Sequence, residues 1–135
     1  MNRDFAINGA LFSTNNGYTF EVIAHWISSY FRRDPFLRLP PSAEAAVDLA
    51  EEHNTWLRRR YPGMFGWVNE SYSGDFAFWN GPQAVDTLLE DMGLKSMRSG
   101  GNWFTWPFRV IDSKEIQFLT EERETRRKQC TAKNG

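Results

Sequence analysis

The sequence predicts a mainly α-helical chain with minor β structure, and three observations lead to this fold class. Apolar residues recur at helical spacing in several segments. Capping and helix-terminating residues bracket those segments. Extended apolar runs are short and contain glycine or proline. The 135 residues are enough for one compact domain. We therefore expect about four helices and one long aromatic-rich loop.

The amino-terminal segment is expected to contain a short strand and the start of a helix. Residues 5–8 form a brief apolar run that suits a strand, and Gly9 permits a turn after it. A polar loop then leads into the helix. Short polar side chains can accept hydrogen bonds from first-turn N–H groups, so three residues are candidate N-caps: Asn15, Asn16 and Thr19.

The first helix should be amphipathic. Its apolar face is predicted to carry Phe20, Ile23, Ile27 and Tyr30 with Phe31. We expect the helix to end near Phe31, because the Asp34-Pro35 pair disfavours a helical conformation before the proline.

The clearest helix is the second, over residues 43–60. Ser42 is a favourable N-cap, and Glu44 suits the positive end of the helix. Tyr61-Pro62-Gly63 ends it. A predicted apolar stripe follows the helical period: Ala46, Val47, Ala50, His53 and Leu57.

The remaining chain alternates irregular segments with helices. Residues 63–81 are predicted as a long ordered loop and residues 82–93 as a third helix that ends at Gly93. Residues 103–111 are extended, at best an edge strand. Asp112 caps a fourth, charged helix expected to run to about residue 128, with frayed residues beyond it.

The composition excludes several functional classes. A net charge of −1 gives no strong attraction to nucleic acid or to anionic lipid. No apolar run is long enough for a spanning helix and no secretory signal is recognisable, so we expect a cytoplasmic protein. The single cysteine rules out an internal disulfide bond. His25 shares a helix face with Glu21 and His53 lies on another helix, so no metal site is expected.

The sequence contains neither G-x-G-x-x-G nor G-x-x-x-x-G-K-[ST], so it has no recognisable dinucleotide or phosphate cradle of its own. The start of the first helix is the one segment that suits a cofactor. Its first N–H groups lack helical partners and carry partial positive charge, which favours a phosphate or a ring that becomes anionic on reduction. An ordinary capped helix is the alternative explanation.

Most of the chain resembles the carboxyl-terminal part of flavin-containing monooxygenases. The opening segment carries this resemblance in five runs: Asn8-Gly9, Leu11-Phe12-Ser13, Asn15–Thr19, Glu21–Ala24 and Trp26-Ile27. Residues 39–44 match a Leu-Pro-Pro-x-Ala-Glu linker that is frequent in bacterial members of the family. Later runs are similar in kind to the aromatic-rich tails of the family: Tyr61–Met64, Trp67–Ser73, Pro82–Gly93 and Met97–Ile111.

The resemblance implies that the chain is the carboxyl-terminal part of a flavoprotein with two dinucleotide-binding domains. Residues 1–34 would be the end of the FAD-binding domain (strand, loop and helix), and residues 35–135 a helical, aromatic-rich extension. The helix start would approach the isoalloxazine ring of FAD. That approach would place these residues near the cofactor: Asn8, Gly9, Asn15, Asn16, Gly17 and Thr19.

The activity implied by the resemblance is that of an FAD- and NADPH-dependent monooxygenase, an oxidoreductase that inserts one oxygen atom from O2 into a small organic substrate. The Gly-rich motifs for FAD and NADP are not in this sequence, so we expect the chain alone to be inactive and to need the dinucleotide-binding part as a partner. A stand-alone helical module that binds an apolar ligand or a protein through an aromatic pocket is the non-enzymatic alternative. A gene fragment without function is a third.

Overall fold

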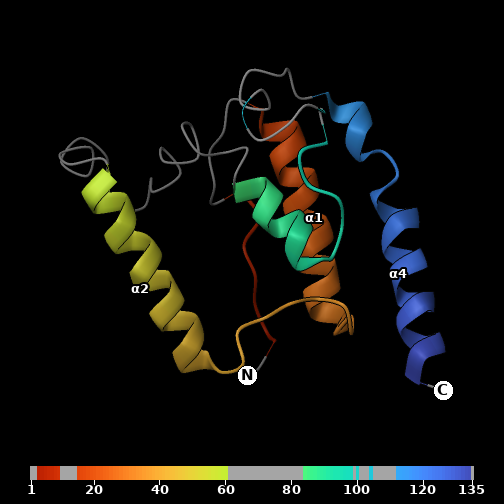
Figure 1. Ribbon diagram of the computed structural model, residues 1–135, viewed down its shortest axis with the longest axis horizontal. Coiled ribbons are helices and arrows are strands. Elements are labelled where there is room, and N and C mark those ends of the chain that lie inside the picture. Colours follow the sequence, from red (N-terminus) through yellow and green to blue (C-terminus); the bar gives the residue numbers. More distant parts are fainter. Residues whose placement is uncertain are drawn as a thin grey trace.

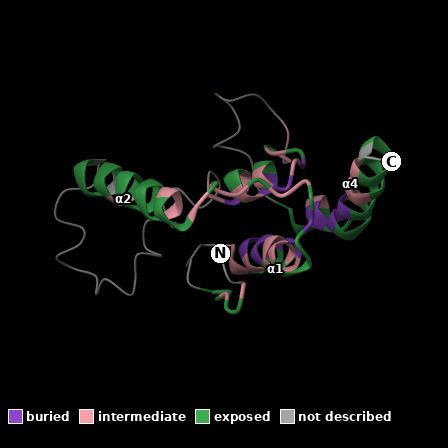
Figure 2. Ribbon diagram, turned by 90° about the horizontal axis from the view of Figure 1, so that it is seen from below, coloured by how far each residue is buried: buried purple, intermediate pink, exposed green. Residues whose placement is uncertain are grey.

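The computed structural model describes residues 3–9, 15–60, 84–98, 100, 104 and 112–134. This described part is mainly helical: α1 (Asn16–Arg32), α2 (Ala43–Arg60), a helix at residues 84–91, the 3-10 helix η4 (Ser113–Ile116) and α4 (Leu119–Asn134). Figures 1 and 2 show α2 at one end of the molecule and α4 at the other, with α1 and the helix at residues 84–91 between them.

Helix α1 begins and ends close to the predicted positions. Asn15 is the N-cap, and its Oδ1 accepts a hydrogen bond from the Tyr18 amide at 3.3 Å. Arg33 ends the helix in the left-handed conformation, with φ of 55°, and its N–H returns to the last-turn carbonyl of Tyr30. This capping confirms one of the three predicted N-caps.

One apolar core joins the central elements. It is built from α1, the helix at residues 84–91, and the chain around η4, and Figure 2 shows the buried positions gathered on these facing sides. The buried side chains are Tyr18, Val22, Val85, Leu89, Met92, Leu94, Ile116 and Leu119. This central body holds α1 in place.

The buried face of α1 differs from the predicted one. Ile23 is buried as expected, but Phe20, Ile27 and Tyr30 are only partly buried and Phe31 is exposed. The buried positions are instead Tyr18, Thr19, Val22, Ile23 and Ser29. The buried side of α1 therefore lies at a different angle around the helix from the predicted apolar stripe. The prediction missed it because Thr19 and Ser29 are polar and yet face inward.

Helix α2 has the predicted bounds, and Ser42 is confirmed as a capping residue: its Oγ accepts a hydrogen bond from the Ala45 amide at 3.1 Å. Three residues of its predicted inward stripe, Val47, Ala50 and His53, are exposed, and Ala46 is partly buried. The side chain of Leu57, the fifth residue of that stripe, lies outside the described part. Within the described residues, no helix covers this face of α2.

The strand predicted at residues 5–8 is wrong. These residues form no strand, because a strand needs a neighbouring strand and the described part of the chain contains none. The segment is held instead along α1: the Arg3 guanidinium donates to the Tyr30 carbonyl, and the Asn8 side-chain amide donates to the Phe20 carbonyl at 3.0 Å.

The third helix ends as predicted, because Gly93 adopts φ of 64°, the left-handed conformation of a residue just after a helix. The predicted fourth helix is divided. Asp112 caps η4, and α4 begins only at Leu119 and continues past the predicted end to Asn134. Ile116, the last residue of η4, and Leu119, the first residue of α4, are both buried in the core. The predicted loop at 63–81 lies outside the described residues, as does nearly all of the extended segment at 103–111.

Candidate functional site

The residues that the resemblance places near a flavin do come together at the start of α1. Asn15, Asn16, Gly17 and Thr19 belong to the N-cap and first turn. The Asn8 side chain is joined to the Phe20 carbonyl in the next turn. Residues 10–14, between the two groups, lie outside the described residues.

The two glycines and Thr19 of this cluster have different surroundings. Gly17 is exposed, and among the described residues a side-chain carbon added there would meet nothing within 4 Å. Gly9 has φ of 91° and lies against the Phe20 ring, so its conformation favours glycine. Thr19 is buried, which makes it part of the body of the helix rather than of an open surface. The cluster therefore has three exposed members, Asn8, Gly9 and Gly17, and one buried member, Thr19.

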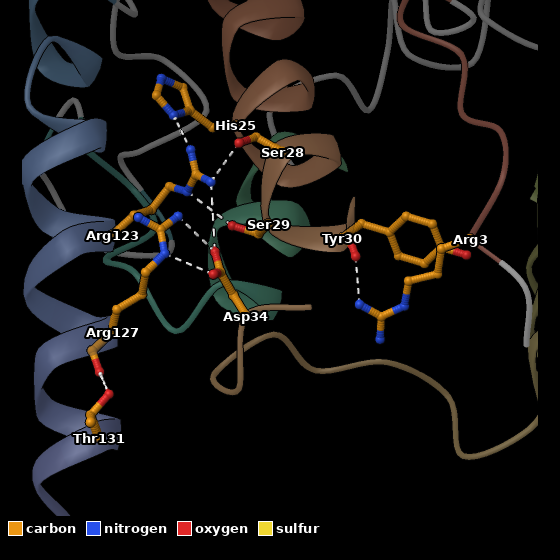
Figure 3. A network of polar contacts seen from close by, with 9 residues as sticks. All are labelled: Arg3, His25, Ser28, Ser29, Tyr30, Asp34, Arg123, Arg127 and Thr131. Atoms are coloured by element: carbon orange, nitrogen blue, oxygen red, sulfur yellow. Dashed lines mark hydrogen bonds and ion pairs between the residues drawn. The ribbon is translucent and has the colours of Figure 1, made fainter. Parts of the chain in front are cut away.

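A second cluster, which we call the α1–α4 polar network, was not predicted. It comprises His25, Ser28, Ser29, Asp34, Arg123 and Arg127 (Figure 3). At its centre the Arg123 side chain, from α4, is buried against α1. Its guanidinium donates to Ser29 Oγ at 2.9 Å, to Ser28 Oγ at 2.9 Å and to His25 Nδ1 at 2.8 Å.

Asp34, just after α1, is the anionic member of this network. Two nitrogens of Arg127 donate to its two carboxylate oxygens at 2.7 and 2.8 Å, and Arg123 lies 3.7 Å away. Burial acts to raise the pKa of Asp34, but hydrogen bonds from Arg127 and Ser29, with the charges of Arg127 and Arg123, outweigh burial and lower that pKa. Asp34 is therefore an anion that joins the end of α1 to α4.

His25, on α1, contacts one residue of its own helix, Glu21, and one residue of α4, Arg123. Its Nε2 lies 3.2 Å from Glu21 Oε1, one turn earlier on α1, which confirms that these two residues share a face. Burial, followed by the positive charge of Arg123, lowers the pKa of His25, and Glu21 only partly opposes this shift. His25 is therefore neutral at pH 7.

An apolar hollow lies on the other side of α1. It has a volume of about 690 Å³ and is bounded by the amino-terminal segment, α1, the linker to α2 and the first turns of α2. Trp26 and Tyr30 form one wall with stacked rings, 5.5 Å between centroids. Trp26 Nε1 donates to Asp91 Oδ2 at 3.1 Å, and burial raises the pKa of Asp91. This volume lies within the range of small-molecule pockets.

These features leave only partial signals in the sequence. Arg123 and Arg127 are four residues apart and so share one face of α4, but the predicted helix is charged on every side and nothing distinguishes this face. Asp34 is recognisable in the sequence only as part of a helix-ending Asp-Pro pair. Their association depends on contacts more than 90 residues apart in sequence.

In the described ranges no cluster of three or more metal-ligating side chains is found. The helices described here are all too short or too polar to cross a bilayer. Comparisons of the chain with protein-family models, with curated proteins and with solved structures found no significant match.

Proposed function

We propose that this chain supplies the carboxyl-terminal part of an FAD- and NADPH-dependent monooxygenase, with both dinucleotides held by a separate part. The observation that carries the proposal is the arrangement at the amino end. The residues expected near a flavin lie together at the start of α1, and the amino-terminal segment that contains two of them also carries two exposed apolar side chains, Phe5 (75% exposed) and Ile7 (60%). An apolar surface of this kind favours a covering partner.

The residues at the start of α1 fit a flavin ring in two respects. The absence of a side chain at Gly17 leaves room for a flat ring to approach the first turn. The partial positive charge of the helix start favours the negative charge that a flavin gains on reduction. When bound, the flavin would supply the oxygen chemistry, and this chain would orient and shield the ring.

The test measures FAD binding by flavin fluorescence. The chain is mixed with the dinucleotide-binding part of a monooxygenase of the resembled family, and each is also measured alone. We expect that this chain alone does not bind FAD. We expect the mixture to bind FAD more tightly than the dinucleotide-binding part does alone. In the mixture, Asn16→Ala should weaken FAD binding by about tenfold, the effect of one lost hydrogen bond or dipole contact.

The matched control is Asn54→Ala, on α2 and remote from the start of α1. It should leave FAD binding unchanged. The proposal fails if the mixture binds FAD no better than the dinucleotide-binding part alone, or if the two asparagine variants behave alike.

The apolar hollow supports a second candidate function, binding of a small apolar ligand by a stand-alone helical module. Its aromatic wall at Trp26 and Tyr30 and its volume of about 690 Å³ are the supporting observations. A titration of the chain with an apolar fluorescent dye tests it. Saturable one-to-one binding that Tyr30→Ala removes, in a soluble monomer that melts cooperatively, would favour this module over the monooxygenase.

A further inference from the structure

The contact between His25 and Arg123 fixes which form of the imidazole the fold accepts. The two nitrogens, His25 Nδ1 and Arg123 Nη1, lie 2.8 Å apart. A guanidinium has five N–H donors and no acceptor, so Nδ1 must be the acceptor. The imidazole is therefore neutral, with its proton on Nε2, where it is donated to Glu21 Oε1 at 3.2 Å.

Protonation of His25 would reverse this contact. Nδ1 would then carry a hydrogen that points at the donors of Arg123, and two cations would face each other with little water between them. The Arg123 side chain is buried, so the guanidinium cannot turn to solvent without leaving Ser28 and Ser29. Loss of the acceptor thus strains the contacts that hold α4 on α1.

The geometry points to His25 as a pH-sensitive device that modulates the docking of α4 on α1: the neutral imidazole holds Arg123 in place, and its protonation weakens that hold and loosens α4.

The charged groups that face His25 come from both helices. Glu21 faces it from α1, while Arg123 and Glu121 act on it from α4. The hollow beside it, of about 370 Å³, has further charged lining residues: Arg32, Glu124 and Arg127. Glu21 and Glu121 favour the protonated imidazole, but burial and then Arg123 outweigh them, and the pKa of His25 is lowered. His25 itself lines this hollow, and 13% of its side chain is exposed.

The lowered pKa of His25 sets the direction in which pH changes the docking of α4. The docked state binds fewer protons at His25 than the undocked chain, so acid favours undocking. Docking is strongest above the ordinary histidine pKa of about 6.5 and weakens as the pH falls below it.

The test uses the full chain with a fluorophore on Cys130, which lies on α4 and is the chain's single cysteine. Fluorescence anisotropy reports the mobility of α4 between about pH 7.5 and pH 5.5, the interval in which histidine titrates. The wild-type anisotropy should fall on acidification. His25→Gln should lose most of this response, because glutamine offers Arg123 an acceptor oxygen that does not titrate.

The chain has two histidines, so His53→Gln is the matched control; His53 is exposed on α2 and its variant should respond like the wild type. The carboxyl groups of Asp86 and Asp91, whose pKa values burial raises, are unchanged in both variants. An acid response that persists in His25→Gln, or a wild-type anisotropy that does not change with pH, would overturn the proposal.

A second measurement applies if circular dichroism shows that His25→Gln is unfolded at neutral pH. NMR titration of the two imidazole rings in the wild type then decides. A His25 pKa below that of His53 supports the proposal, and a His25 pKa equal to or above that of His53 contradicts it.

Discussion

Helices α2 and α4 lie at opposite ends of the molecule and differ in how they are attached. Both are rich in charged residues and have similar lengths, with 18 residues in α2 and 16 in α4. Helix α4 is joined to α1 by the polar network around Arg123 and Asp34. Helix α2 carries more apolar side chains, yet Val47, Leu49 and Trp56 are exposed.

The comparison teaches that apolar content alone does not decide which helix is docked. Arg123 and Arg127 find acceptors on α1 and at Asp34, and these directional contacts fix α4. The apolar side chains Val47 and Leu49 of α2, by contrast, stay exposed. Helix α2 therefore keeps exposed apolar side chains, whereas polar contacts fix α4 to the central body. The following substitutions test this contrast.

The largest expected difference is between two identical substitutions, Leu89→Ala and Leu49→Ala. Leu89 is fully buried in the central body and Leu49 on α2 is 58% exposed. Leu89→Ala should lower the free energy of unfolding by about 2–5 kcal/mol, because it removes packed methyl groups and leaves a cavity. Leu49→Ala should change it by less than about 0.5 kcal/mol. Urea denaturation measures both, and equal effects would contradict the contrast.

Removal of the charge at Asp34 should have the next largest effect. Asp34→Asn leaves the guanidinium of Arg127 without its paired carboxylate, which should lower the free energy of unfolding by about 1.5–3 kcal/mol. The matched control is Asp48→Asn, at an exposed position of α2, which should have little effect.

The lowered pKa of Asp34 also predicts that the free energy of unfolding depends on pH. Because the fold lowers the pKa of Asp34, its contribution to stability is complete above the ordinary aspartate pKa of about 3.9 and is lost as the pH falls through the lower folded-state value. Acid titrations at several urea concentrations should show this loss in the wild type and a smaller one in Asp34→Asn. Parallel curves for the two proteins would argue against the ion pair.

Gly93→Ala tests the left-handed turn that ends the helix at residues 84–91. Gly93 has φ of 64°, and an added side-chain carbon would lie 2.4 Å from a guanidinium nitrogen of Arg126. The left-handed backbone should make the variant less stable by about 1–3 kcal/mol. Gly17→Ala, where nothing lies within 4 Å and φ is not in that region, should be neutral or slightly stabilising in thermal melts.

The smallest effect on stability is expected for the exposed face of α2. The double substitution Val47→Lys with Trp56→Ser should change the free energy of unfolding by less than about 0.5 kcal/mol. It should still reduce the fluorescence of a dye that binds exposed apolar surface, because it removes two apolar side chains from that face. An unchanged dye signal together with a large loss of stability would show that α2 is docked.

Much of the local structure was predictable because its causes are short-range. The bounds of α2, the capping by Asn15 and Ser42, and the ending at Gly93 depend on residues within one turn. The pairing of Glu21 with His25 follows from helical spacing in the same way. The sequence could also predict that the residues expected near a flavin gather at the start of α1, because most of them are neighbours in sequence.

By itself, then, the sequence determined where helices begin and end, because capping and backbone preferences act between neighbouring residues. Only the tertiary structure decided which sides of those helices are inside. Ser29 is buried on α1 since a guanidinium 94 residues away donates to it, and Val47 is exposed since no described helix covers it. A helical period identifies an apolar face, but burial requires a partner surface, and the identity of that partner depends on contacts distant in sequence.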